Sequence, residues 1–152
     1  MCIVLSASLF LSSIEAKSFL AEEDTVANVQ PFMLFEPFGI LNPNHNYLDD
    51  GASSLEQLSS ETKARITATT YASQTVDSIG ITFILQRWTG STWVDATAAV
   101  ERSTTNRDSY TSSVTWNVTE GYYYRAKTIH WIQQGTTYEQ GERISYHILI
   151  GP

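Results

Sequence analysis

The residues of this chain that could do chemistry do not form a recognisable catalytic motif. Its three histidines, His45, His130 and His147, are far apart in the sequence. There is no nucleophile elbow, zinc-protease motif, Cys-x-x-Cys pair, phosphate-binding loop or dinucleotide fingerprint. We therefore expect a protein that is not an enzyme and binds no cofactor, in which His130 and His147 are ordinary strand residues.

One polar segment partly matches a calcium-binding loop. Asn42, Asn44 and Asn46 alternate along the chain, and Asp49 and Asp50 follow them. A calcium loop of this type also needs a glycine after the third ligand and a glutamate at its end, and both are missing. The pattern favours a solvated, Asn-rich turn, and we expect no metal site.

The remaining candidate chemistry is that of large aromatic and polar side chains on two predicted strands. Aromatic rings stack on sugar rings or pack against another protein chain, and amide and guanidinium groups supply hydrogen bonds. If residues 78–88 and 122–133 pair in one sheet, their outward-facing side chains form a single surface. The predicted binding residues on that surface are Ile84, Gln86, Trp88, Tyr123, Arg125 and Trp131.

We predict that Trp88 and Trp131 lie near each other on the solvent side of this sheet and carry the binding. Large aromatic side chains on a solvent face need a cover. Three covers are open: residues 22–41 of the same chain, a protein partner or second copy, and a carbohydrate.

The elements that must position these residues are β-strands. From Glu61 onward Ser, Thr, Val, Ile, Tyr and Trp dominate, and short runs alternate with turn residues. Strands are predicted at residues 65–73, 78–88, 93–102, 109–118, 122–133 and 138–150. A hairpin turn is predicted at 89–92, a polar loop at 104–108 and a bulge at Gly141. This spacing predicts an all-β, antiparallel β-sandwich of about six to seven strands.

The strand at 122–133 has a register that its charges define. A buried charge is costly, so Arg125 is expected to point outward. Period-2 alternation then sends Tyr122, Tyr124, Ala126 and Thr128 into the core. A tyrosine at the start of such a strand is expected to form a tyrosine corner, in which its hydroxyl bonds back to the preceding loop.

Two stretches resemble known domains. Residues 118–126 resemble the F strand of a fibronectin type III or immunoglobulin-like domain, and residues 81–94 resemble a C strand, turn and C′ strand. Together with the N-terminal segments, LQRWTGSTWV and GYYYRAKTIHW resemble an uncharacterised family of small secreted proteins from Gram-positive bacteria, over about residues 60–150. The resemblance implies secretion and a sandwich fold, and it supplies no catalytic residues to transfer.

The N-terminal third differs from the rest in composition. An uncharged apolar run over residues 2–14, followed by small residues, is typical of a secretory signal at 1–21, although the usual positive charges are missing. A buried N-terminal segment is the alternative. The run is too short to span a bilayer, which takes about 20 residues, and we expect no stable membrane insertion after signal removal. Residues 22–60 are predicted to form an irregular acidic arm, with one helical turn at 53–58, before a β-domain at 61–152.

The charge distribution gives no basic surface for nucleic acid. Residues 22–61 hold eight acidic residues and no lysine or arginine, and the net charge of the chain is −7. The sequence therefore predicts a secreted, extracellular, non-enzymatic module for interaction or for surface or matrix assembly. The alternative is a small carbohydrate-binding module that uses exposed aromatic residues.

Overall fold

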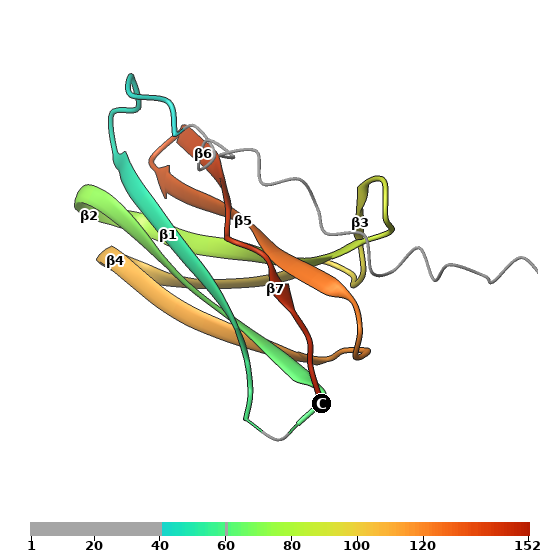
Figure 1. Cartoon of the computed structure of the whole chain (residues 1–152). Coiled ribbons are helices and arrows are strands. Elements are labelled where there is room, and N and C mark those ends of the chain that lie inside the picture. Colours follow the sequence, from blue (N-terminus) through green and yellow to red (C-terminus); the bar gives the residue numbers. More distant parts are fainter. Residues whose placement is uncertain (1–40, 60) are drawn as a thin grey trace, which may run out of the picture.

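Strands and turns make up the described part of the chain, residues 41–59 and 61–152 of a computed structural model, and no helix occurs in it (Figure 1). The strands are β1 (Leu48–Gln57), β2 (Lys63–Trp88), β3 (Trp93–Asp95), β4 (Val100–Asn117), β5 (Tyr123–Gln134), β6 (Thr137–Ile144) and β7 (Ile148–Leu149). All pair antiparallel in one 7-stranded sheet of order β1-β2-β5-β6, in which β3 and β4 also pair with β2, and β7 with β5. The all-β, antiparallel prediction is confirmed. A single continuous sheet does not by itself identify an immunoglobulin-like or fibronectin type III-like sandwich.

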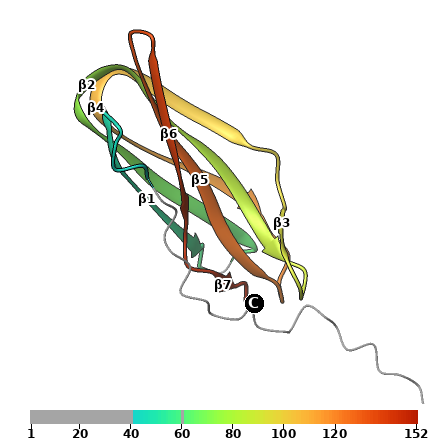
Figure 2. The ribbon, with the colours of Figure 1, turned by 90° about the horizontal axis from the view of Figure 1, so that it is seen from above.

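The centre of the fold is a long ribbon made of β2 and β4. Residues 63–71 of β2 pair with 109–117 of β4, and residues 76–83 pair with 100–107. The register shifts between Tyr71 and Val76, Asn106 has a positive φ of 55°, and both strands bend there together (Figures 1 and 2). The predicted strands at 65–73 and 78–88 are thus one strand, and the predicted loop at 104–108 is wrong because β4 runs through it.

The predicted irregular arm contributes a strand at its C-terminal end. β1 pairs with residues 64–72 of β2, so the helical turn predicted at 53–58 is wrong, and the folded part begins before residue 61. Residues 1–40, which hold the predicted signal and about half of the arm, lie outside the described residues. The predicted strand at 93–102 is divided, because β3 ends at Asp95 and residues 100–102 already belong to β4.

The predicted alternation of β5 is confirmed. Tyr124, Ala126 and Thr128 are buried, whereas Arg125 is only half-buried on the opposite face. The Tyr124 hydroxyl accepts a hydrogen bond from the backbone N–H of Thr119 at 3.1 Å, as a tyrosine corner requires. Tyr122 is partly buried and packs against the same core cluster.

Polar residues separate two apolar clusters along β5. The larger cluster contains Ala64, Ile66, Ala68, Ile81, Phe83, Leu85, Tyr124, Ala126 and Ile150, and the smaller contains Leu48, Val76, Ile79 and Ile132. Between them His130 is fully buried and both of its ring nitrogens are hydrogen-bonded, Nδ1 to Thr70 Oγ1 at 2.8 Å and Nε2 to Thr128 Oγ1 at 2.9 Å. Burial lowers the pKa of His130 to about 4, and the nearby charge of Arg143 acts in the same direction. The ring is therefore neutral at pH 7.

Side chains connect β1 to β6, the two outer strands of the sheet order. The Glu139 carboxylate accepts hydrogen bonds from the backbone N–H groups of Asn46, Tyr47 and Leu48 at 2.6, 2.9 and 2.7 Å. Burial acts to raise the pKa of Glu139, but these N–H groups outweigh it and hold the pKa below its usual value. The Arg143 side chain donates to Gly51 O at 2.8 Å. The sheet thus curls until its ends are held together by side chains.

Two glycines allow this close approach. A Cβ on Gly51 would lie 2.5 Å from the His130 ring, so β1 packs directly over β5. A Cβ on Gly141 would collide with the Leu41 side chain. Gly141 pairs in regular register with His130, so the bulge predicted there is wrong, and the predicted last strand instead divides into β6 and β7.

Candidate binding surface

The outer face of the β2–β5 pair holds the six predicted binding residues. Ile84 lies opposite Lys127, Gln86 lies opposite Arg125, and Trp131 lies opposite Gly80. Paired residues of an antiparallel ladder point to the same side. The structure thus places Ile84, Gln86, Trp88, Tyr123, Arg125 and Trp131 on one face, as predicted.

The predicted proximity of Trp88 and Trp131 is wrong. Because Trp131 pairs with Gly80, it lies eight residues along β2 from Trp88. At the usual rise of a strand this is about 26 Å, so the two rings are at opposite ends of the face. They cannot contribute to one small binding site.

Trp88 instead belongs to an aromatic cluster, which we define as Trp88, Trp93, Tyr123 and His147. The ring centroids of Trp88 and Trp93 are 5.3 Å apart, and those of Trp93 and His147 are 5.9 Å apart. Tyr123 meets His147 edge to face at 5.5 Å. The four rings come from β2, β3, β5 and the segment before β7, and they meet at one end of the face.

Arg125 covers part of this cluster. Its guanidinium carbon lies 4.5 Å from the centroid of the Trp93 ring, a cation–π contact. Its Nε donates to Gln86 Oε1 at 2.8 Å, and Gln86 Nε2 donates to Asp95 Oδ1 at 2.8 Å. This chain of hydrogen bonds fixes the guanidinium plane over the indole. Burial lowers the pKa of His147, and the nearby charge of Arg125 acts in the same direction.

The six predicted residues differ in exposure. Ile84, Gln86 and Tyr123 are 8%, 7% and 6% exposed, so they support the surface from below. Trp88, Trp93, Arg125 and His147 are half-buried, and Val94 and Leu149 are exposed on neighbouring positions. Within the described residues, His147 packs against Trp93 and Tyr123, and Arg125 lies over Trp93. The predicted cover by residues 22–41 lies outside them except for Leu41, which packs with the smaller core cluster.

Trp93 and His147 were missed by the sequence analysis. The signal for Trp93 was present, since the predicted turn at 89–92 is confirmed by the Thr89 N–H to Thr92 O bond of 3.0 Å. A four-residue turn places Trp93 directly opposite Trp88. His147 had no such signal, because its position depends on where β7 returns beside β5.

A second aromatic pair occupies the other end of the face. Trp131 and Tyr138 are stacked, with ring centroids 6.0 Å apart and an interplanar angle of 28°. Trp131 lies flat over Gly80, where any Cβ would collide with the indole ring. Tyr138 is 53% exposed, and its hydroxyl donates to Gln140 Oε1 at 3.3 Å. This pair presents an aromatic ring with polar neighbours.

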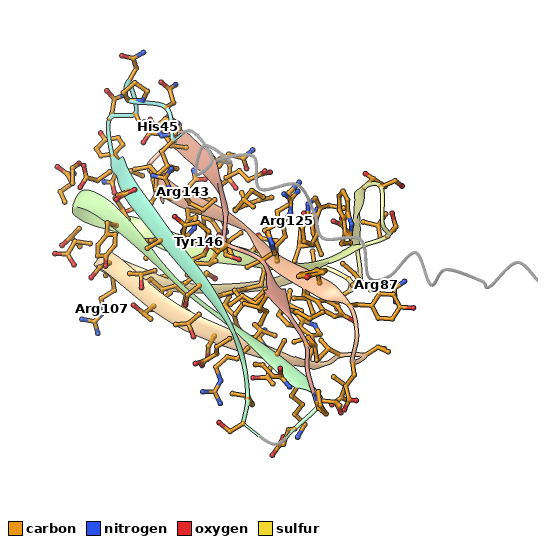
Figure 3. All side chains as sticks on the ribbon, viewed as in Figure 1. His45, Arg87, Arg107, Arg125, Arg143 and Tyr146 are labelled. Carbon is orange, nitrogen blue, oxygen red and sulfur yellow. The ribbon has the colours of Figure 1, made fainter. Side chains whose placement is uncertain are left out.

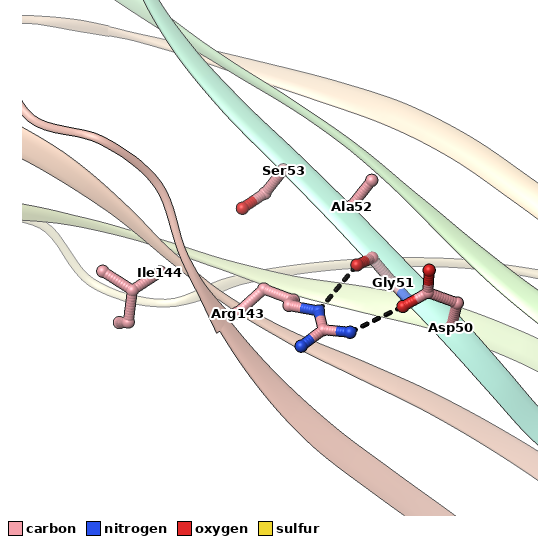
Figure 4. A pocket seen from close by; sticks show the side chains of 6 residues that line it. All are labelled: Asp50, Gly51, Ala52, Ser53, Arg143 and Ile144. Atoms are coloured by element: carbon pink, nitrogen blue, oxygen red, sulfur yellow. Dashed lines mark hydrogen bonds and ion pairs between the residues drawn. The ribbon is translucent and has the colours of Figure 1, made fainter. Parts of the chain in front are cut away.

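A shallow depression lies between β1 and the end of β6, with a volume of about 320 Å³ (Figure 4). Its lining residues are Asp50, Gly51, Ala52, Ser53, Arg143 and Ile144. Arg143 Nη2 bonds Asp50 Oδ1 at 2.6 Å, and the hydrogen bonds from Arg143 and Gly51 outweigh burial and lower the pKa of Asp50. The two charged groups therefore neutralise each other. They are not arranged as a nucleophile with a base.

Metal-binding side chains do not gather anywhere in residues 41–59 and 61–152, where no group of three His, Cys, Asp or Glu could hold an ion. The Asn42 side chain instead accepts a hydrogen bond from the backbone N–H of Asn44 at 3.0 Å, as a local turn does. In the same part of the chain, no helix is long and apolar enough to cross a membrane.

Comparison with protein-family models, with curated proteins and with solved structures finds no match to this chain. The resemblance to a family of secreted Gram-positive proteins stays a prediction. Function must be argued from the surface itself.

Proposed function

We propose that this protein is a secreted, non-enzymatic interaction module of the immunoglobulin-like sandwich type, which binds an extracellular protein through the aromatic cluster. The observation that carries the proposal is the meeting of Trp88, Trp93, Tyr123 and His147 at one end of the outer face, beneath Arg125.

The residue types in the cluster support a protein partner. Trp, Tyr and Arg are the residues that most often contribute the binding energy of protein interfaces. Trp and Tyr bury a large area with few rotatable bonds, and Arg adds hydrogen bonds and stacking. Here the rings pack on one another and the guanidinium is held by Gln86, so little side-chain entropy remains to be lost on binding. Exposed Leu149, which pairs with Tyr123 on the same face, would extend the apolar contact.

Binding of the labelled full chain to the surface of the cells that produce it tests the proposal. We expect Trp93→Ala to reduce binding at least about tenfold, as the loss of a central aromatic contact does. The matched control is Trp131→Ala, which removes the same side chain about 26 Å away on the same face. Protease treatment of the cells should abolish binding, whereas periodate oxidation of their glycans should not. Equal binding by wild type and Trp93→Ala would refute the assignment of this site.

A carbohydrate-binding module is the second candidate, and the Trp131–Tyr138 pair favours it. Sugars stack on exposed aromatic rings and need polar groups at the ring edge, and Tyr138 and Gln140 provide both. If the sugar site is the functional one, Trp131→Ala and Tyr138→Ala should lose binding to the cells, whereas Trp93→Ala should keep it. Periodate oxidation should then abolish binding. A glycan array probed with wild type, Trp131→Ala and Tyr138→Ala identifies the sugar class.

Secretion is supported by the apolar run at residues 2–14. We expect the mature chain to begin between Lys17 and Glu22. Mass spectrometry of the exported protein measures this directly, and an exported chain that retained Met1 would contradict it.

A further inference from the structure

The second half of β4, residues 109–117, forms a long sheet edge with no strand on its outer side within the described residues. Among the described strands, β4 pairs only with β2. The backbone N–H of Val118 donates to Thr62 O, so the backbone groups of Val118 point toward the β2 side. Successive residues of a strand direct these groups to opposite sides. The odd-numbered residues from Ser109 to Asn117 therefore direct their N–H and C=O groups away from β2. Within residues 41–59 and 61–152, these groups have no strand beside them and form a free edge.

The other strand edges of the fold are already occupied or short. Glu139 and Arg143 join β6 to β1, and Gln57 Nε2 donates to Gly151 O at 2.8 Å further along β1. β3 has only three residues. Among the described strands, β4 thus offers the longest edge for pairing.

The two halves of β4 differ in charge. The first half carries Glu101, Arg102, Arg107 and Asp108, and Arg107 projects from the bend (Figure 3). The second half, SYTSSVTWN, has no charged residue, no proline and no glycine. Charged residues and prolines are the usual means by which proteins prevent pairing between sheet edges. Only the first half is protected in this way.

The core is also incomplete along this edge. On β2, the inward-facing Ala64, Ile66 and Ala68 are 0–2% exposed. Their neighbours across the ladder on β4, Trp116 and Val114 among them, pack against the same cluster but stay half-buried. A strand added outside β4 would cover these side chains.

We propose that this edge pairs antiparallel with the same edge of a second copy, centred on Ser113. In this register Thr111 lies opposite Thr115 of the second copy, and the outward-directed backbone groups of both strands meet as hydrogen-bonded pairs. Tyr110 lies opposite Trp116 of the second copy on the inner face, at the closer, non-hydrogen-bonded positions. Aromatic pairs at such positions stabilise a sheet. The strand is thus complementary to itself, which argues for a second copy as the occupant.

Sedimentation equilibrium of the full chain tests the proposal. We expect a concentration-dependent dimer of twice the 17.0 kDa chain mass. Ser113 is exposed and lies on the twofold axis, so Ser113→Lys places two like charges opposite each other and should weaken the dimer at least about tenfold. Ser103→Lys is the matched control, because it adds the same charge to an exposed serine of the protected half. A monomeric wild type, or a dimer that Ser113→Lys leaves intact, overturns the proposal.

Mixing tests the register. Ser113→Glu alone should also be monomeric, but a mixture of Ser113→Glu and Ser113→Lys should form a heterodimer because the opposite charges then face each other. Thr115→Pro is a charge-independent variant, since it removes an edge N–H without touching the β2 ladder, and it should also dissociate the dimer. Circular dichroism checks that each variant is folded. A dimer that Ser103→Lys dissociates equally, or a mixture that stays monomeric, shows that the pairing is not the one proposed. Trp93→Ala should leave the dimer unchanged, so this proposal and the proposed function can fail separately.

Discussion

Acid should destabilise this protein through a single buried histidine. Thr70 Oγ1 donates its one proton to Gly80 O at 3.1 Å, and with that bond made Thr70 accepts from His130 Nδ1–H. Nε2 then accepts from the Thr128 hydroxyl. The neutral ring is therefore fully satisfied, and a proton on Nε2 would reverse the Thr128 bond within a buried site.

The magnitude follows from the pKa. His130 has a pKa of about 4 in the folded protein against an ordinary value of 6.5, because burial and the charge of Arg143 oppose protonation. Between these values the unfolded chain takes up a proton that the folded chain does not, so the free energy of unfolding falls as the pH falls. The full difference corresponds to about 3 kcal/mol, which is a large part of the stability of a small domain.

Urea unfolding of wild type and His130→Leu, followed by tryptophan fluorescence from about pH 7.5 to about pH 4, measures this contribution. The carboxylates titrate in both proteins, so their effect cancels in the difference between the two. We expect wild type to be more stable at neutral pH and to lose about 3 kcal/mol of that advantage by pH 4. A difference in unfolding free energy that stays constant with pH would refute the role of His130.

Three further substitutions probe the packing. Tyr124→Ala should cost about 3–5 kcal/mol in urea unfolding, and a loss under about 1 kcal/mol would contradict its burial. Glu139→Gln should cost about 2–3 kcal/mol at neutral pH, because an amide cannot accept the three backbone N–H groups as the carboxylate does. Since the pKa of Glu139 is lowered, this penalty should shrink as the pH falls below the ordinary pKa of a glutamate and wild type becomes protonated. Gly51→Ala should cost about 1–3 kcal/mol, measured by thermal unfolding, through its contact with His130. Gly151→Ala, with open space around it, is the neutral control.

The register of β5 could be predicted because local features define it. Arg125 must reach water, and strict alternation then assigns every neighbour to a face. β1 could not be predicted in this way, because Gly51-Ala52-Ser53-Ser54 contains no apolar alternation. Its place depends on Gly51 fitting over His130, almost eighty residues later. Pairing with β2 decided its conformation.

The candidate site shows the same division. The face of each predicted residue followed from alternation, but distances along the face required the pairing register. Once Trp131 is known to pair with Gly80, its separation from Trp88 follows directly. His147 depends on the break between β6 and β7, where Ser145 Oγ accepts from Ala126 N–H at 2.8 Å in place of a regular ladder bond. Such a side-chain bond leaves no pattern in the sequence.

The two proposed surfaces lie on different parts of the curled sheet, and this separation has a consequence. The aromatic cluster lies on β2, β3, β5 and the β7 segment, whereas the pairing edge is the second half of β4, beside the first half of β2. A dimer formed at β4 would therefore leave the aromatic cluster of each copy accessible. Two linked sites bind a surface that carries many copies of a partner far more tightly than one site does, without any new contact. Ser113→Lys should thus weaken binding to intact cells while leaving the affinity for a single soluble partner unchanged, and Trp93→Ala should reduce both. Equal losses for the two variants in both assays would mean that dimerisation and binding use the same surface.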